Sequence, residues 1–340
     1  MTVKMSRGKF AALNACANER GVIAALAVDH RLNLLQSIAD ARGAEATAHD
    51  MQAFKSTVAS VLSPYASALL LDPEYGLEAI ASCAPDAAVM LAYEKSGYTG
   101  EAGDRLPDLL PEWSVRRLVE AGAHAIKILL YYNPRDNENI NARKQAYVER
   151  VGAECVALDV PFFLEPLVYD YTLGDSQELE FACQKPAYVT SVIEEFGQPR
   201  YSVDVLKVEL PINPVFVAGT RAFTGGTGAY TRQQALGYLR EAASVASRPL
   251  IYLSAGISDT TFCEMLELAA EAGARFAGVL CGRATWQGGI PVYARQGQEA
   301  LADWLTERGV QNIQEINRVV TVSATSWWDV YGGRDAIEIA

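Results

Sequence analysis

The strongest constraint on the fold is an alternation of short apolar, β-rich runs with longer stretches of helical pattern. Helical stretches such as 50–65 and 141–159 carry charges on one side and small apolar residues on the other. The β-rich runs are apolar almost throughout, which is typical of parallel strands covered on both faces. Eight strand–helix units predict an α/β fold, a single (β/α)₈ TIM barrel. The runs span residues 22–29, 67–73, 87–94, 123–132, 161–169, 204–211, 249–256 and 276–282.

The motifs at the ends of the predicted strands and helices favour a barrel over an open dinucleotide-binding sheet. Such a sheet usually has G-x-G-x-x-G after its first strand, whereas HRLNLL follows Asp29 here. The segments 120–129 and 271–280 each show a helix end, a glycine and a strand entry, so Gly122 and Gly273 are expected to cap helices. No linker or composition break divides the 340 residues. We therefore expect one domain over residues 1–340, with its core from about 21 to 328.

Charge and cysteine usage limit the partners. A net charge of −12 argues against a general nucleic-acid or anionic-membrane binder. The six cysteines are scattered without a C-x-x-C pair, as in reduced intracellular proteins. The apolar run 21–28 is too short to span a bilayer, and the first 20 residues lack a signal-peptide layout. We expect a cytoplasmic protein with neither a nucleic-acid nor a membrane partner.

Four charged residues lie in or at the end of predicted strands. Asp29 ends the first strand, Lys127 lies in the fourth, Glu165 in the fifth and Lys207 in the sixth. A buried charge costs several kcal/mol unless it is paired. One such residue alone is compatible with a structural ion pair. Several on separate strands, converging at the carboxyl-end mouth of a barrel, indicate a catalytic site.

Two lysines beside two carboxylates favour Schiff-base chemistry. A lysine amine must be neutral to attack a ketone, and both burial and a neighbouring cation favour the neutral form. Lys127 near Lys207 would therefore help to activate it. The iminium that results is an electron sink for carbon–carbon cleavage. Glu165 could transfer the protons, and Asp29 could hold an amine or a substrate hydroxyl.

Two further segments predict a phosphate site. Ser254 and Gly256 follow the seventh strand, and Gly282 and Arg283 follow the eighth. Barrel enzymes often bind phosphate between these two loops, through backbone N–H groups.

Other kinds of site are not supported by the motifs. There are three histidines and no H-E-x-x-H, G-K-[ST] or G-x-S-x-G motif. We therefore expect no metal and no other cofactor.

Several longer strings resemble class I, metal-independent tagatose-1,6-bisphosphate aldolases. The likeness runs from about Gly21 to Trp328 and so covers nearly the whole chain. It implies a (β/α)₈ barrel that reversibly cleaves D-tagatose 1,6-bisphosphate to dihydroxyacetone phosphate and D-glyceraldehyde 3-phosphate. The strings include SPYASALLLDPEYG (63–76), LAYEKSGY (91–98), IKILLYY (126–132), KQAYVERVGAEC (144–155), PFFLE (161–165), DVLKVELP (204–211), LIYLSAGIS (250–258) and AGVLCGRATW (277–286).

The resemblance assigns roles motif by motif. It implies that Lys207 is the Schiff-base residue, Glu165 the proton-transfer residue and Lys127 an assisting cation, with Asp29 at the end of the first strand. It further implies a sugar-phosphate substrate and a homo-oligomer. The segments after strands seven and eight resemble the C1-phosphate site, formed by Ser254, Gly256, Gly282 and Arg283.

The chain also departs from this family. The family usually has D-Q-R after the first strand, whereas this chain has Asp29, His30 and Arg31, and Pro166 after Glu165 is also unexpected. These positions flank the part of the pocket that would contact the substrate beyond C3 and so distinguish one sugar from another. We therefore count His30 and Arg31 among the substrate-binding candidates.

Three alternatives stay open. The enzyme could also accept fructose 1,6-bisphosphate. A second alternative is a class I aldolase for another ketose 1-phosphate, such as 6-deoxy-6-sulfofructose 1-phosphate, which would need a sulfonate-selective pocket. The third is a non-catalytic, sugar-phosphate-sensing barrel, which would not need Lys207, Glu165 and Lys127 together.

Overall fold

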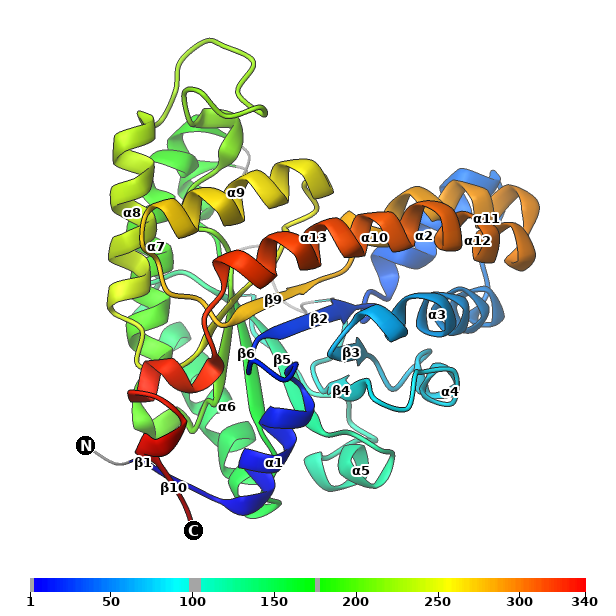
Figure 1. The fold of residues 1–340 in the computed structure, drawn as a ribbon, viewed down its shortest axis with the longest axis horizontal. Coiled ribbons are helices and arrows are strands. Elements are labelled where there is room, and N and C mark those ends of the chain that lie inside the picture. Colours follow the sequence, from blue (N-terminus) through cyan, green and yellow to red (C-terminus); the bar gives the residue numbers. More distant parts are fainter. Residues whose placement is uncertain (1–2, 98–104, 175–177) are drawn as a thin grey trace.

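The computed structural model describes residues 3–97, 105–174 and 178–340. At its centre is a closed barrel of eight strands, each paired in parallel with its neighbours in chain order (Figure 1). Every barrel strand lies inside one of the predicted runs, so the predicted α/β barrel is confirmed. The strands are β2 (Ile23–Ala27), β3 (Ala68–Leu71), β4 (Ala88–Ala92), β5 (Ala125–Tyr132), β6 (Phe162–Val168), β7 (Val205–Val208), β8 (Leu250–Tyr252) and β9 (Gly278–Cys281).

Helices follow the strands and pack around the outside of the barrel. The predicted stretches 50–65 and 141–159 correspond to α3 and α6, and α3 ends early because a 3₁₀ turn containing Pro64 takes over. Gly122 and Gly273 follow the last turns of α5 and α9 with φ of +107° and +73°, as expected of capping glycines. The helices are α2 (Leu32–Arg42), α3 (Ala48–Leu62), α4 (Leu77–Ile80), α5 (Val115–Glu120), α6 (Glu138–Ala157), α7 (Leu179–Phe196), α8 (Arg232–Ser244), α9 (Asp259–Glu271), α10 (Arg283–Trp286), α11 (Ile290–Gln296), α12 (Gln298–Trp304) and α13 (Val310–Ser323).

The strands divide their side chains between two cores. Outward residues pack against the helices, and inward residues fill the barrel. Many inward positions are alanine, and those at the carboxyl ends of β2 and β4, Ala27 and Ala92, leave room at the mouth for long charged side chains. The inward alanines on the strands are Ala25, Ala27, Ala68, Ala88, Ala92 and Ala125.

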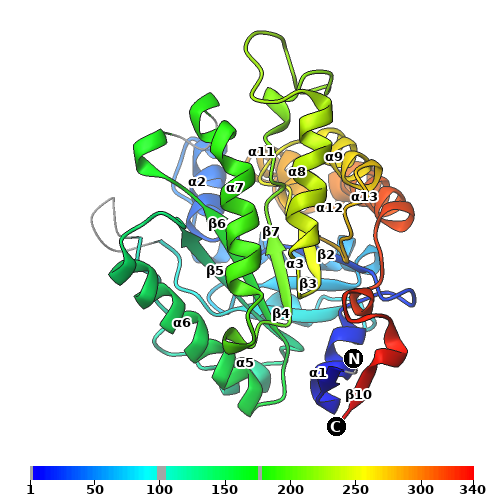
Figure 2. The ribbon, with the colours of Figure 1, turned by 90° about the vertical axis from the view of Figure 1, so that its left-hand side faces the viewer.

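The two chain ends meet at the opposite end of the barrel. Strand β1 (Val3–Met5) pairs in parallel with β10 (Ile337–Ile339), and α1 (Arg7–Ala15) lies beside them (Figure 2). Trp327, in the 3₁₀ segment Trp327–Tyr331, is fully buried among the inward residues. None of the helices formed by residues 3–97, 105–174 and 178–340 has the length and hydropathy needed to cross a membrane.

Candidate active site

Three of the four predicted catalytic side chains fall on the inward face of their strands, whereas β2 ends at Ala27 and Asp29 lies two residues beyond it. Lys127 is two residues after the inward Ala125, and Lys207 is two residues after the inward Val205. Glu165 follows the inward Phe163 by the same step. Because side chains alternate along a strand, this spacing directs all three into the barrel near its carboxyl-end mouth.

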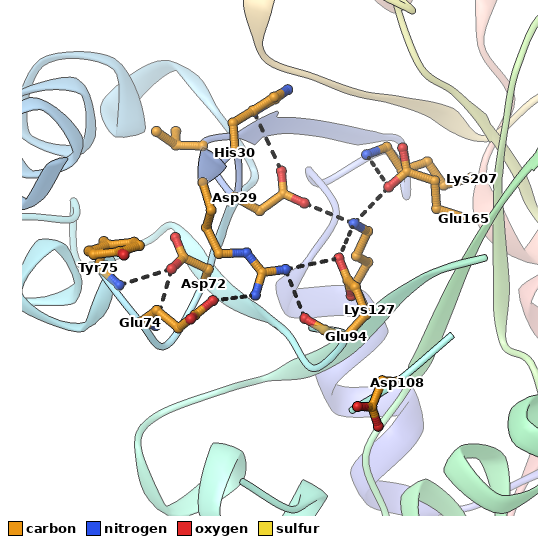
Figure 3. Close-up of polar contacts among 12 residues, drawn as sticks. Asp29, His30, Asp72, Glu74, Tyr75, Glu94, Asp108, Lys127, Glu165 and Lys207 are labelled. Carbon is orange, nitrogen blue, oxygen red and sulfur yellow. Dashed lines mark hydrogen bonds and ion pairs between the residues drawn. The ribbon is translucent and has the colours of Figure 1, made fainter. Parts of the chain in front are cut away.

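Lys127 is the centre of the site (Figure 3). Its Nζ lies 2.8 Å from Asp29 Oδ2, 2.9 Å from Glu94 Oε1 and 2.8 Å from Glu165 Oε2. An ammonium has three N–H donors, so the three carboxylates can use all of them. The Lys127 side chain is 1% exposed, and it is fixed in place by this cage.

Lys207 joins the same cluster through Glu165. Its Nζ lies 2.9 Å from Glu165 Oε2, the oxygen that also contacts Lys127. One carboxylate oxygen therefore bridges the two lysines. Lys207 has one carboxylate partner where Lys127 has three, so its amine is the less constrained of the two.

The oppositely charged groups of the cluster stabilise one another's ionised forms. Burial by itself would raise the pKa of Asp29 and of Glu165, but the ammonium groups of Lys127 and Lys207 outweigh it and lower both. Burial would likewise lower the pKa of Lys127, and the surrounding carboxylates instead raise it well above its ordinary value. At neutral pH, Lys127 is therefore a cation and Asp29 and Glu165 are carboxylates.

Arg31 is committed to carboxylates within the protein. Its Nη1 lies 2.6 Å from Glu74 Oε2, and its Nη2 donates to the backbone O of Glu94 at 2.8 Å. The Arg31 side chain is 4% exposed. Although Arg31 borders the site, these contacts make it a brace for Glu94, the third carboxylate around Lys127.

His30 stands next to Asp29 at the rim of the site. Its Nδ1 is 3.8 Å from Asp29 Oδ1, and its ring packs edge-on against Trp286. Burial, the largest influence, lowers the pKa of His30 to about 4, because it outweighs the attraction of Asp29. His30 therefore presents a neutral imidazole at physiological pH.

Three residues that hold Asp29 and Lys127 in place were not predicted: Glu94, Lys55 and Asp72. Glu94 is the last residue of the apolar run 87–94 and Asp72 the next to last of the run 67–73, so each charge comes shortly after a buried strand, as Asp29 does. That position was the available signal. Lys55 lies in the middle of α3, where a lysine is ordinary, and nothing local in the sequence marks it.

The unpredicted Lys55 anchors the backbone on both sides of Asp29. Its Nζ donates to the carbonyls of Val28 and His30, and lies 2.5 Å from Asp72 Oδ2. Asp72 Oδ1 in turn accepts from two backbone N–H groups of the following turn. Both side chains of this pair are 0% exposed, so the carboxyl end of β2 is held by a fully buried ion pair.

The loops after β8 and β9 meet where a phosphate site was predicted. Ala255 and Gly256 have φ of +49° and +80°, and a Cβ on Gly256 would lie 3.0 Å from Arg283 Cζ. Ser254 is buried just before this turn. The guanidinium of Arg283 thus lies directly over a left-handed backbone turn.

Gly282 has a packing role that its sequence context did not reveal. A Cβ on Gly282 would lie 2.0 Å from the backbone O of Ala27, at the end of β2. The indole Nε1 of Trp286 donates to the same carbonyl at 2.9 Å. Gly282 therefore permits close contact between β9 and β2.

One cavity of about 610 Å³ connects most of these groups. A volume of this size suits a sugar-sized ligand. Asp29, His30, Arg31, Lys127, Glu165, Lys207 and Arg283 all line it, and Ser254, Gly256 and Gly282 stand in the adjoining loops. Two further cations, Lys95 and Arg105, line the cavity as well.

Glu209 lies two residues after Lys207, so strand alternation predicts that both side chains point to the same face, but Glu209 makes different contacts. Its Oε1 lies 3.2 Å from Lys185 Nζ, and its Oε2 accepts from the backbone N of Val168 at 3.0 Å. Glu209 thus ties β6 and α7 together at the edge of the cavity, in the ion-pairing role that suits a residue other than the catalytic acid.

Known proteins share both the sequence and the fold. Residues 23–288 match the DeoC/LacD family aldolase. A tagatose 1,6-diphosphate aldolase of Listeria monocytogenes serotype 4b is 44% identical over 337 residues, which cover 99% of this chain and 98% of that protein. One of Staphylococcus aureus strain JH9 is 47% identical over 322 residues, which cover 95% of this chain and 98% of that protein.

The fold recurs at low sequence identity. A structure of fructose-bisphosphate aldolase from Plasmodium falciparum, in complex with TRAP and a small-molecule inhibitor, covers 95% of this chain and 98% of its own. The TM-score is 0.69 at 13% identity, a likeness of fold alone. The family match and the near-complete alignment with relatives above 40% identity are decisive: this chain belongs to the DeoC/LacD family of aldolases.

Proposed function

We propose that this chain is a class I aldolase that forms a Schiff base on Lys207 and reversibly cleaves D-tagatose 1,6-bisphosphate. The observation that carries the proposal is the bridging of Lys207 and Lys127 by one oxygen of Glu165, at 2.9 and 2.8 Å, inside the cavity. A nucleophilic amine, a fixed cation and a proton-transfer group are thus within contact of one another.

The two lysines differ in a way that selects the nucleophile. Lys127 is surrounded by three carboxylates that raise its pKa, so it stays protonated and cannot attack a ketone. Lys207 contacts Glu165 alone among the carboxylates of the described residues. Glu165 accepts the proton that Lys207 loses, and the neutral amine then adds to the C2 carbonyl of the substrate. The same proton converts the C2 hydroxyl of the carbinolamine to water, which leaves an iminium.

Cleavage follows from the iminium. A carboxylate of the cluster removes the proton of the C4 hydroxyl, and the electrons of the C3–C4 bond move into the iminium. This step releases glyceraldehyde 3-phosphate and leaves an enamine. Protonation at C3 and hydrolysis then free dihydroxyacetone phosphate and restore the Lys207 amine. Lys127 keeps its charge throughout and holds Asp29 and Glu165 in position.

A bisphosphate suits the distribution of cations around the cavity. Arg283 stands over the turn after β8 and lines the same cavity as Lys207. Lys95 and Arg105 come from the segments after β4, and Arg105 lies over the Tyr131 ring at 4.3 Å. The relatives named above carry the name tagatose 1,6-diphosphate aldolase.

The substrate test is a comparison of kcat/KM for tagatose 1,6-bisphosphate, fructose 1,6-bisphosphate and 6-deoxy-6-sulfofructose 1-phosphate. A clear preference for the sulfonate would overturn the proposed substrate.

The Schiff base itself can be trapped. We expect borohydride reduction in the presence of dihydroxyacetone phosphate to inactivate the enzyme and to attach one adduct to Lys207, located by peptide mass spectrometry. The Lys207→Met variant should give no adduct. An adduct on Lys127, or none in the active wild type, would contradict the mechanism.

We also propose that no metal takes part. The carboxylates that could bind a cation, Asp29, Glu94 and Glu165, already surround the Lys127 ammonium. Activity should survive dialysis against EDTA, and loss of activity that Zn²⁺ restores would overturn the proposal. The single domain, the homo-oligomeric state and the cytoplasmic location expected from the sequence stay predictions.

A further inference from the structure

A second cavity, of about 330 Å³, lies at the other end of the barrel. It is bounded by the end of α8, the entries to β8 and β9, and the segment after α13. Leu250 begins β8 and Ala277 precedes β9, whereas the catalytic side chains stand toward the carboxyl ends of their strands. Because the barrel strands are all parallel, the two cavities open at opposite ends.

Three arginines line this second cavity, in a chain whose net charge is −12. Arg240 projects from α8, Arg248 precedes β8 and Arg275 precedes β9. Asp329 is the one carboxylate among the lining residues, and it accepts a hydrogen bond from the backbone N of Ser326. The cavity is therefore a positively charged region on a protein whose net charge is negative.

The polar groups left without partners in this cavity are donors. Arg248 Nε and Trp327 Nε1 are buried and have no hydrogen-bond partner within residues 3–97, 105–174 and 178–340, and the Trp327 side chain is fully buried. The Arg248 side chain also hydrogen-bonds the side chain of Tyr331, and Asp204, which is close enough to feel the Arg248 charge, is already paired with Lys9 at 2.7 Å. Buried N–H groups of this kind call for acceptor oxygens.

The remaining arginines are placed to supply the charge. Arg240 Nε donates to the backbone O of Ala272 at 2.8 Å, which steadies its guanidinium beside the cavity. The side chain of Arg275 makes no hydrogen bond or ion pair with any described residue. Guanidinium groups match phosphate oxygens with paired donors, so a convergent set favours phosphate over a neutral ligand.

We propose that this cavity is a second anion site, which binds the phosphate group of a small molecule. Arg240, Arg248 and Arg275 would bind the phosphate oxygens, and Trp327 Nε1 would donate the further hydrogen bond. The volume accommodates either inorganic phosphate or a small phosphate monoester. The site is separate from the aldolase cavity and does not depend on the proposed mechanism.

The test is phosphate binding by the full chain, measured by equilibrium dialysis with labelled inorganic phosphate. The double variant Arg240→Met/Arg275→Met replaces two exposed side chains and should fold as the wild type does, which a thermal melt checks. Because the aldolase cavity is itself proposed to bind phosphate groups, the readout is a difference: the variant should bind one equivalent fewer and keep the wild-type KM for the sugar substrate.

A matched control lies on the same helix. Arg232 of α8 forms a surface ion pair with Glu271 away from the cavity, and Arg232→Met should bind as many equivalents as the wild type. Arg248→Lys keeps the charge but loses the guanidinium donors, and should weaken the extra equivalent at least tenfold. Equal stoichiometry and affinity in the wild type and the double variant would overturn the proposal.

A competition experiment separates the two sources of phosphate. If glycerol 3-phosphate displaces the extra equivalent at a tenfold lower concentration than unlabelled phosphate does, the site is selective for a monoester. If it does not, the site is one for inorganic phosphate. Both results presuppose the extra equivalent and so support the second site.

Discussion

At the scale of single residues, the site depends on unequal sharing of carboxylates between two lysines. Three carboxylates surround Lys127, and one of them, Glu165, also contacts Lys207. In the proposed mechanism, Lys127 stays a cation while Lys207 acts as the nucleophile. The carboxylates around Lys127 raise its pKa, because each of them stabilises the protonated amine.

Replacing Glu165 tests its role in proton transfer. Glu165→Gln keeps the size of the side chain but cannot accept the proton of Lys207, so we expect kcat to fall about 10²–10⁴-fold, as for other proton-transfer residues. Steady-state kinetics measure the loss. Glu315→Gln, on the surface of α13, should keep wild-type activity. A kcat within twofold of wild type for Glu165→Gln would exclude Glu165 from the chemistry.

His30 should make the protein less stable in acid. The unfolded imidazole gains a proton as pH falls below about 6.5, whereas the folded one stays neutral down to its pKa of about 4. Falling pH across this window therefore favours unfolding, by up to about 3 kcal/mol. Urea unfolding at pH 7 and pH 4.5 measures the loss for wild type and His30→Gln. The variant should lose less, and equal losses would contradict the low pKa of His30.

At the scale of elements, the site is held by contacts between neighbouring strand ends and helices. Lys55 of α3 fixes the carboxyl end of β2 and, through Asp72, the turn after β3. Arg31 links the start of α2 to Glu94 after β4. These links connect the segments that follow β2, β3 and β4, so Asp29 and Glu94 are positioned before any ligand arrives.

Lys55→Met should be severely destabilising. Methionine fills the space but leaves the buried Asp72 carboxylate without its cation, a loss of about 3–5 kcal/mol in the free energy of unfolding. Urea unfolding measures it. Arg318→Met, which removes an exposed ion pair of α13, should leave the urea midpoint nearly unchanged. A loss of under about 1 kcal/mol for Lys55→Met would mean that the pair is not the anchor of β2.

Gly282→Ala tests the close contact between β9 and β2. The added methyl meets the backbone O of Ala27 and must push the strand ends apart, which we expect to cost about 1–3 kcal/mol and to lower kcat/KM. Gly237 in α8 is the matched control, since a Cβ there meets nothing within 4 Å. Gly237→Ala should be neutral or slightly stabilising. Equal stability of the two variants would refute the packing role of Gly282.

At the scale of the whole molecule, the chain ends close one end of the barrel while the other end carries the site. The two-stranded sheet of β1 and β10 joins residues more than 300 positions apart (Figure 2). Lys9 of α1 adds an ion pair with Asp204 beneath β7, at 2.7 Å. Both links lie at the end of the barrel opposite the mouth that holds Lys127 and Lys207, so we expect them to contribute stability and not chemistry.

Removing residues 334–340 should separate these two properties. The truncated chain loses β10 and its pairing with β1, so we expect Tm to fall by several degrees while kcat/KM stays near wild type at moderate temperature. Calorimetry and the aldolase assay measure the two. An unchanged Tm would show that the pairing is not needed, and a loss of activity in a folded chain would show that the far end influences the site.

The sequence by itself determined the barrel and the identities of the main catalytic candidates. Apolar runs covered on both faces leave few folds open, and Lys127, Glu165 and Lys207 stand out because a charge in such a run is costly without a purpose. Their inward direction follows from strand alternation alone. The positions of the strands were therefore predictable to within a few residues.

Only the tertiary structure decided which charges meet. Glu94, Lys55 and Asp72 are distant in sequence from the groups they hold, and ion pairing depends on distances that local patterns do not carry. The structure likewise turned Arg31 inward to Glu74 and Glu94, and gathered the arginines of the second cavity from separate elements. The sequence gives the chemical type of each side chain, but the partners and the protonation state of that side chain depend on its neighbours in space.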